Sequence, residues 1–194
     1  MNEETPLISP IKPQSSNKAV LKEIIILGLI ALGIILPFRL FIAEPYIVSG
    51  ASMDPTFKTG DYLIVDKLSY ELGTPKRNTV IVFKYPNDPT KSFIKRVIGL
   101  PGETVIMEGN NVRIINKDKP QGFEVDQSYV THPQAESFQK TLKSDEYFVM
   151  GDNRRESFDS RSWGPLQKKF ILGKPILRLF PINKISVQPG KDDK

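Results

Sequence analysis

The sequence predicts a mainly β domain, a folded or barrel-like sheet, preceded by one N-terminal transmembrane helix. From Pro45 onward, short runs of Val, Ile, Phe and Tyr are separated by turn residues about every eight to twelve positions, a spacing typical of short strands. No long stretch of this region repeats its apolar residues with the helical period. A single long apolar run, residues 24–43, precedes it. These three observations fix the expected class.

The apolar run reads IIILGLIALGIILPFRLFIA, and Ile24 to Phe38 carry no charge. About twenty helical residues span the roughly 30 Å hydrocarbon core of a bilayer, so we expect an anchor over residues 23–43. Arg39 would reach the headgroups, and Pro37 would kink or end the helix. A buried soluble helix and a cleaved signal peptide are the alternatives. The second needs small residues before the cut, and "FIAEP" is a poor site because Phe41 stands two residues before Ala43.

Lysines are unequally distributed on the two sides of this run. Lys12, Lys18 and Lys22 precede it, and only Lys58 follows within a similar distance. The positive-inside rule places the N-terminus in the cytoplasm and residues 44–194 on the far side. A bacterial plasma membrane, a thylakoid or an organelle membrane all fit. We expect a disordered cytoplasmic terminus over 1–22, a β domain over 44–187 and a flexible tail over 188–194.

Within the β domain, the apolar runs predict individual strands. They cover residues 61–68, 78–85, 92–99, 146–153 and 174–181, with a hairpin over 104–115 that turns at 109–111. Residues 116–144 are more polar and less regular, and we expect an insertion or a sub-domain there.

Composition excludes several classes of function. The chain has no Cys and one His, His132, so it has no disulfide framework and no Cys-based zinc or redox site. The net charge is +5 and the basic residues are interleaved with acidic ones, which argues against nucleic acid as a partner. No metal or other cofactor is predicted.

The stretch SGASMDP contains a candidate nucleophile, Ser52. Gly50 and Ala51 leave space for a peptide backbone, Pro55 favours a turn, and exposed N–H groups there would face a developing oxyanion. A serine in such a turn is also typical of an ordinary loop. A Ser-His-Asp triad would require His132, which lies in the irregular polar segment, where a solvated side chain is expected.

With His scarce, a base for Ser52 must be a lysine with a lowered pKa. A free lysine has a pKa of about 10.4, and burial lowers it by penalising the charged form. On a strand through SFIKRVIGLPG, Phe93, Lys95 and Val97 share one face, so Lys95 lies between two apolar neighbours. Taken alone, the pattern favours an ordinary strand lysine whose ammonium reaches water. If Lys95 is buried between its apolar neighbours instead, it is the candidate base.

Four segments in order, SGASMDPTF, DYLIVDKLSY, FIKRVIGLPGE and GDNRRESFDSRSWGP, resemble the motif boxes of type I signal peptidases. The similarity runs from about Tyr46 to Ile185, and the middle insertion matches least. It implies a membrane-anchored endopeptidase that removes signal peptides from exported preproteins, its protein partners, outside the membrane. It also implies that Ser52 is the nucleophile and Lys95 the general base.

The resemblance implies supporting roles for further residues. Ser157 matches a hydroxyl that orients the lysine. Two supporting ion pairs are implied, Asp159 with Arg161 and Asp152 with Arg96. Gly50 occupies a position where some members have a serine that helps to stabilise the oxyanion, so the N–H of Ser52 is the principal donor expected here.

Substrate binding is also implied by the resemblance. Pockets for small side chains would receive the first and third residues before the cut, with the substrate added as a β-strand. The positions that match the lining of these pockets are Tyr46, Val48, Phe57 and Ile94.

Two other functions fit parts of the sequence. A self-cleaving, repressor-like Ser-Lys protease would carry an N-terminal DNA-binding helical domain where this chain has an apolar run. A membrane-tethered, non-catalytic β domain or inactive relative would bind partners. Such a module has no need of Ser52, Lys95 and Ser157 together, which favours the enzyme.

Overall fold

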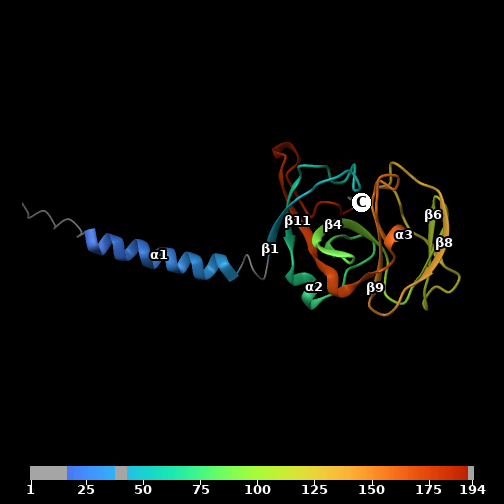
Figure 1. The fold of residues 1–194 in the computed structure, drawn as a ribbon, viewed down its shortest axis with the longest axis horizontal. Coiled ribbons are helices and arrows are strands. Elements are labelled where there is room, and N and C mark those ends of the chain that lie inside the picture. Colours follow the sequence, from blue (N-terminus) through green and yellow to red (C-terminus); the bar gives the residue numbers. More distant parts are fainter. Residues whose placement is uncertain (1–16, 38–42, 192–194) are drawn as a thin grey trace, which may run out of the picture. The chain divides into compact units, whose positions relative to one another are not determined.

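A computed structural model describes residues 17–37 and 43–191. The chain divides into two compact units between Arg39 and Leu40. The first contains one helix, and the second is the β domain (Figure 1).

The helix of the first unit, α1, spans Asn17–Pro37. Residues 17–22, expected to be disordered, form its first turns. Among residues 17–37 and 43–191, no helix is long and apolar enough to cross a membrane. The transmembrane helix expected over 23–43 is therefore not found, and residues 1–16 and 38–42 lie outside the described residues. The apolar side chains of α1 are exposed at Ile24, Leu27, Leu29, Ile30 and Leu32.

The β domain contains two sheets of antiparallel strands, which confirms the mainly β class. In the larger sheet, of eight strands, the order is β1-β2-β11-β3-β4-β9-β10, and β12 pairs with β11. Its strands are β1 (Ala43–Ile47), β2 (Tyr62–Asp66), β3 (Val80–Tyr85), β4 (Asp88–Gly99), β9 (Glu146–Met150), β10 (Leu166–Gln167), β11 (Ile171–Phe180) and β12 (Ser186–Val187).

The smaller sheet has the order β7-β6-β5-β8. Its strands are β5 (Thr104–Gly109), β6 (Asn111–Ile115), β7 (Phe123–Glu124) and β8 (Glu136–Thr141). The predicted hairpin over 104–115 is the β5–β6 pair. The polar segment 116–144 supplies both outer strands of this sheet, β7 and β8. In Figure 1, β6 and β8 lie at the end of the domain away from β1 and β11.

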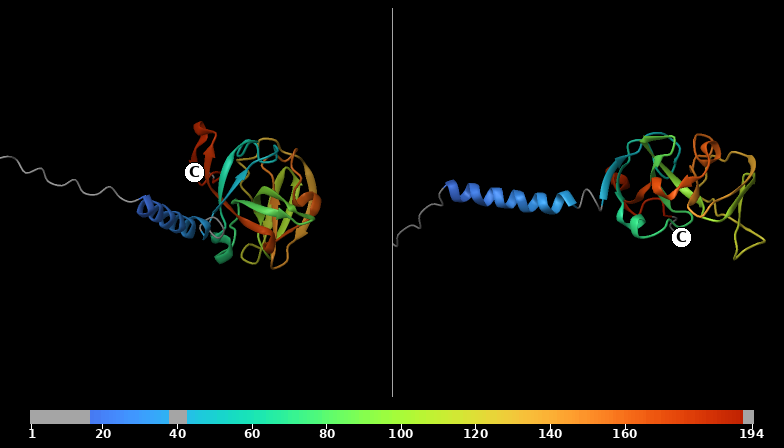
Figure 2. Two further views of the ribbon diagram at one scale, coloured as in Figure 1. Left: turned by 60° about the vertical axis from the view of Figure 1, so that its left-hand side comes forward. Right: turned by 60° about the horizontal axis from the view of Figure 1, so that its bottom comes forward.

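Short helices connect the strands in the described part of the domain: α2 (Leu68–Leu72), α3 (Ser160–Trp163), and the 3₁₀ turns η2 (Lys168–Phe170) and η3 (Ile182–Lys184). Strands from distant parts of the sequence lie side by side in both views of Figure 2, as β2 and β11 do. The chain returns repeatedly to the same sheet, so residues far apart in sequence can meet at one site.

Strands β4 and β9 contribute to more than one apolar cluster. Ile98 of β4 and Phe148 of β9 pack with residues of the smaller sheet, whereas Val97 and Val149 pack with Ile81 and Phe83 of β3. Alternate residues of a strand point to opposite faces, so these two strands join the packing of both sheets. A third cluster, of Val48, Met53, Phe57, Leu63 and Val80, lies beneath the turn that contains Ser52.

The end of the chain differs from the expected flexible tail. Strand β12 folds back on β11, with Val187 opposite Leu177, and brings residues 188–191 onto the domain. There Pro189 is buried and the carbonyl of Gly190 accepts a hydrogen bond from Arg96. The remaining residues of the expected tail, 192–194, lie outside the described residues.

Candidate active site

Ser52 and Lys95 meet at the centre of the site. Lys95 Nζ lies 2.6 Å from Ser52 Oγ and 3.0 Å from the carbonyl oxygen of Ile94. The register of β4 on β3 places Lys95 opposite Ile81, and Lys95 is 4% exposed. Its Nζ lies 5.5 Å from the centre of the Phe93 ring, in agreement with the face predicted for Phe93 and Lys95. The ammonium therefore does not reach water, as a typical strand lysine would.

Burial lowers the pKa of Lys95 from 10.5 to about 8, because the charged form loses hydration. The negative charges of Asp159 and Asp152 oppose this change by favouring the ammonium. A lysine with a pKa near 8 has a substantial neutral fraction at mildly alkaline pH. In that form it can accept a proton from the hydroxyl it contacts.

The turn that contains Ser52 is fixed from both ends. The Ser52 carbonyl accepts a hydrogen bond from the N–H of Asn153 at 3.1 Å, and the Gly50 N–H donates to Thr59 Oγ1 at 3.0 Å. Met53, which is 1% exposed, anchors the turn in the core. Within the described ranges the N–H of Ser52 has no hydrogen-bond acceptor, so it is available to an incoming oxygen.

Ser157 lies next to the pair but does not contact the lysine through a hydrogen bond. Its Oγ accepts from the N–H of Gly151 at 3.1 Å, and the hydrogen bonds of Lys95 Nζ to described residues go to Ser52 Oγ and the carbonyl of Ile94. A Cβ at Gly151 would collide with both Ser157 Oγ and the carbonyl oxygen of Ser52. Gly151 therefore brings these two serines together, and the orienting role of Ser157 stays a prediction.

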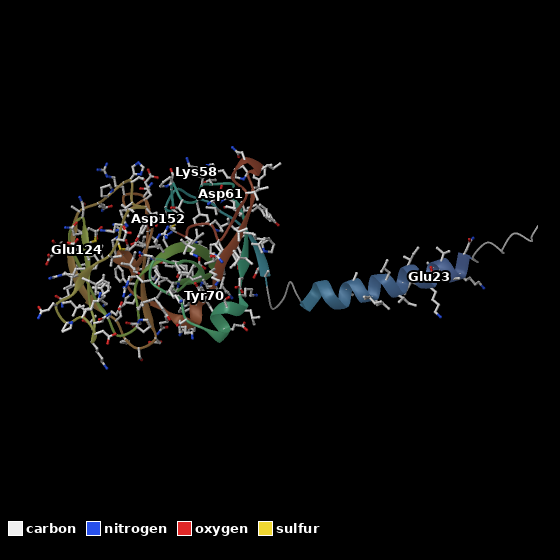
Figure 3. The ribbon with its side chains drawn as sticks, turned by 180° about the vertical axis from the view of Figure 1, so that it is seen from behind. Glu23, Lys58, Asp61, Tyr70, Glu124 and Asp152 are labelled. Carbon is white, nitrogen blue, oxygen red and sulfur yellow. The ribbon has the colours of Figure 1, made fainter. Side chains whose placement is uncertain are left out.

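Both expected ion pairs are present beside the site. Arg96 binds Asp152 through two hydrogen bonds, of 2.9 and 2.7 Å, and both side chains are buried. Arg161 binds Asp159 at 2.8 and 3.0 Å. In the view of Figure 3, Asp152 lies between the part of the domain that carries Glu124 and the part that carries Lys58 and Asp61. The Arg96–Asp152 pair holds the loop after β9 against β4, and the Asp159–Arg161 pair lies within the segment that leads from this loop into α3.

A cleft of about 260 Å³ opens at Ser52 and Lys95. Of the residues expected to line it, Tyr46, Val48 and Ile94 do so, and Gly50, expected near the oxyanion, also lines it. Phe57 does not line it; its side chain is 0% exposed and packs in the apolar cluster beneath the turn. The other lining residues are Ile47, Ser49, Ala51, Leu63, Val82, Ser92, Phe93, Glu156 and Phe158.

Sequence reasoning missed Glu156 and Phe158, which belong to the loop between β9 and α3. Phe158 is 52% exposed, and its ring lies 5.8 Å from that of Tyr85, which stacks on Phe93. Their only signal was their position on either side of Ser157, since an irregular loop has no period that assigns its side chains to a face.

His132 does not line the cleft. Its side chain is exposed, and Nδ1 lies 2.9 Å from the hydroxyl of Thr131. Within residues 17–37 and 43–191, no group of three or more His, Asp or Glu side chains is arranged to hold a metal ion.

Comparison with known proteins identifies the class to which this fold and site belong. A family model described as signal peptidase, peptidase S26, matches residues 21–180. A signal peptidase I of Leptolyngbya laminosa is 35% identical, with 93% of this chain and 92% of that protein covered. A probable signal peptidase I-1 of Synechocystis is 39% identical over 84% of this chain and 85% of its own length.

A crystal structure of a signal peptidase I from Enterococcus faecalis is 28% identical and covers 52% of this chain and 96% of that one, with a TM-score of 0.45. The family model spans most of the chain, and the two relatives above cover most of it at more than 30% identity. The chain therefore belongs to the signal peptidase family, peptidase S26, and is an enzyme of the serine endopeptidase class.

Proposed function

We propose that the protein is a membrane-anchored endopeptidase that removes N-terminal signal peptides from exported preproteins with a Ser-Lys pair. The observation that carries the proposal is the 2.6 Å contact between Ser52 Oγ and a buried Lys95 whose pKa is lowered to about 8. The names of the relatives support the substrate class.

In the first half of the proposed reaction, neutral Lys95 takes the proton of Ser52 as Oγ attacks the scissile carbonyl carbon. The resulting oxyanion accepts a hydrogen bond from the free N–H of Ser52. The C–N bond then breaks, the leaving amine takes the proton from the Lys95 ammonium, and an ester with Ser52 remains.

In the second half, Lys95 removes a proton from a water molecule that attacks the ester carbonyl. The C–O bond to Ser52 breaks, and Ser52 recovers its proton from Lys95. Both halves need the same neutral amine at the same place, which its burial and its contact with Ile94 O provide.

The cleft supports binding of the substrate as an added β-strand. Strand β1 is at the edge of the larger sheet, and its residues 46–47, together with 92–94 of β4, line the cleft. Tyr46 and Ile94 from these strands, with Val48 just after β1, leave a small apolar space, which suits small side chains before the cut.

We propose that Ser157 and the two ion pairs position this pair rather than take part in the chemistry. Gly151 donates to both Ser157 Oγ and Asp159 Oδ2, and thereby ties the loop to the end of β9. The carboxylates also limit how far the pKa of Lys95 falls.

We propose that residues 23–43 hold the enzyme on a membrane with the β domain outside the cytoplasm. The uncharged run of Ile24 to Phe38 and the exposed apolar side chains of α1 support this attachment. Lys12, Lys18 and Lys22 support a cytoplasmic N-terminus. Attachment would raise the effective concentration of enzyme near signal peptides in the same membrane.

The mechanism is tested with Ser52→Ala and Lys95→Ala. Each is expected to abolish cleavage of a preprotein in detergent or lipid, because the first removes the nucleophile and the second the base. His132→Ala, the control, is expected to keep full activity. Release of the mature protein is measured on a gel, and cleavage by the Lys95→Ala variant at the parental rate would exclude Lys95 as the base.

A further inference from the structure

We propose that the C-terminal segment 188–191 positions the Ser52–Lys95 pair by fixing the side chain of Arg96, with Gly190 as its central residue. This inference rests on the proposed Ser-Lys function. The segment lies beyond the residues matched by the family model, which end at 180.

The segment is held on the domain at several points. The N–H of Gln188 donates to the carbonyl of Ile176 at 2.7 Å, just after the pairing of Val187 with Leu177. Pro189 is buried, and the N–H of Lys191 donates to the carbonyl of Gln188 at 3.2 Å. Residues 188–191 therefore follow a defined path across the domain.

Only glycine fits at position 190. Its φ is +82°, a conformation that side chains disfavour. A Cβ there would lie 2.9 Å from Phe57 Cε2 and 2.9 Å from Val80 Cγ2, both of which belong to the cluster beneath the Ser52 turn. The backbone of the segment thus packs directly on the apolar layer that supports the nucleophile.

Gly190 also holds the buried arginine. Its carbonyl oxygen accepts a hydrogen bond of 2.8 Å from Arg96 Nη1, which also donates to the carbonyl of Asn78 at 2.7 Å. The other side of the guanidinium binds Asp152, and its face lies 3.9 Å from the centre of the Tyr129 ring. Displacing Gly190 would take away one of the two carbonyl oxygens that accept from Nη1 of this buried cation.

Arg96 is connected to both members of the pair. It follows Lys95 on β4, so a shift of its backbone moves the base. Its partner Asp152 accepts a hydrogen bond of 2.6 Å from Thr56 Oγ1, in the turn after Ser52. The next residue, Asn153, donates to the Ser52 carbonyl. The path from Gly190 to the reacting atoms therefore consists of direct contacts.

The charges near Lys95 give this path a measurable effect. Asp152 favours protonated Lys95, and its charge is offset by Arg96. A displaced Arg96 would offset it less, so protonation of Lys95 would be favoured and cleavage would need a higher pH. The other charged groups near the pair are Asp159, Arg154, Arg161 and Glu156, and none of them contacts Gly190 through a described hydrogen bond or ion pair.

The test is Gly190→Ala in the full-length protein, measured as kcat and KM for a signal-peptide substrate across pH. The control, Gly102→Ala, places the same strain at φ +78° but has nothing within 4 Å of the new Cβ. We expect Gly190→Ala to lower kcat by about 10- to 100-fold through misplacement of the pair. KM should stay unchanged because Gly190 does not line the cleft. The acid limb of the profile should move to higher pH, and Gly102→Ala should show neither change.

Two results would overturn the inference. One is a pH profile and kcat of Gly190→Ala equal to those of the parent or of Gly102→Ala. The other applies if Gly190→Ala does not fold. Pro189→Ala, which loosens the segment without a clash, is then measured in its place and should show a smaller change in the same direction. A Pro189→Ala variant with the kcat and pH profile of the parent would overturn the inference. If the Ser52→Ala or Lys95→Ala variant still cleaves at the parental rate, the proposed function fails instead.

Discussion

Lys95 determines how activity should depend on pH. The mechanism needs its neutral form, and burial sets its pKa at about 8. Below that value the neutral fraction falls about tenfold per pH unit, so kcat/KM should rise with pH and level off above a midpoint near 8. Peptide cleavage measured from about pH 6 to 10 checks this, and a rate that is flat or falls with pH over that range would contradict it.

The same lysine should lower stability at neutral pH. Its pKa falls from 10.5 in the free side chain to about 8 in the fold, so between these values the unfolded chain binds more protons and stability rises with pH. Below pH 8 the full penalty applies, roughly 3 kcal/mol at most; above 10.5 it vanishes. Lys95→Met should therefore raise the free energy of unfolding at pH 7, with a gain that shrinks as pH rises from 8 to 10.5.

Urea unfolding at pH 7 and at pH 10.5 measures this gain in the free energy of unfolding. The control is Lys84→Met on β3, where the lysine is exposed and the substitution should give no such pH-dependent gain. An equal gain for Lys95→Met at pH 7 and at pH 10.5 would contradict the assignment of its pKa.

The turn motif and strand alternation made Ser52 and Lys95 candidates, because both report on neighbours close in sequence, but on their own they favoured an ordinary turn serine and a strand lysine that reaches water. The predicted roles of the two residues came from the resemblance of the four ordered segments to the family. It could not assign Phe57 correctly, because that side chain follows the nucleophile turn inward to the core. The hydrogen bond from the Gly151 N–H to Ser157 depends on the close packing of Gly151 against both Ser157 and the Ser52 carbonyl. This packing joins residues far apart in sequence, so a local pattern could not predict it.

Among the structural elements, the turn between β4 and β5 depends on one buried carboxylate. Glu103 is 5% exposed and accepts hydrogen bonds from Arg77 at 2.6 and 2.7 Å, from the N–H of Leu100 at 2.8 Å and from Asn116 at 2.9 Å. These contacts tie the end of the larger sheet to the start of the smaller one. The carboxylate therefore stabilises the connection between the sheets.

Glu103→Ala should lower the free energy of unfolding by about 3–5 kcal/mol, because it removes the acceptor of Arg77 Nη2, the Leu100 N–H and the Asn116 amide and leaves the Arg77 cation without its carboxylate, although Arg77 Nη1 keeps its hydrogen bond to the carbonyl of Ile98. The control is Glu108→Ala, whose side chain is 71% exposed and lies 3.7 Å from Arg113; it should cost less than about 1 kcal/mol. Denaturant unfolding gives both values. A loss at Glu103 no larger than at Glu108 would show that the turn does not depend on this carboxylate.

The strands were the most predictable elements. Runs such as those of β3 and β9 are apolar enough to be recognised from composition alone. The strands at the edges of the smaller sheet were not recognised, because β8 is mostly exposed and keeps only Phe138 against Phe148. The path of residues 188–191 was missed for a similar reason. The segment has no run of apolar residues that would predict burial, and it packs on the domain through the ring of Pro189 and the backbone of Gly190 instead.

At the scale of the whole molecule, the proposed membrane attachment predicts behaviour that the β domain alone would not show. The full-length protein should float with phospholipid vesicles in a density gradient. A double variant, Leu27→Lys with Ile30→Lys, should float poorly, since each charge at the centre of an apolar segment costs about 2.5–3.5 kcal/mol on insertion. Both side chains are exposed on α1, so the change should leave the helix itself intact.

The control for flotation is Gln139→Lys, at an exposed position of β8, which should float like the parent. The double variant should still cleave a soluble peptide at the parental rate but process a membrane-borne preprotein more slowly. Undiminished flotation of the double variant would remove α1 as the attachment.

Two consecutive side chains of strand β4 lie on its opposite faces and have different partners. Lys95 contacts Ser52 on one face, and Arg96 contacts Asp152 and Gly190 on the other. The arrangement therefore depends on whether an odd or an even number of residues is inserted into the strand. The pairing of β4 with β3 sets the two faces, with Lys95 opposite Ile81 and Arg96 opposite Val80. Inserting one residue between Ser92 and Lys95, within this pairing, would exchange the two faces and send the guanidinium towards the nucleophile. Inserting two would restore them. Natural and engineered variation in length should be tolerated at the β3–β4 turn, and along β4 itself only in pairs.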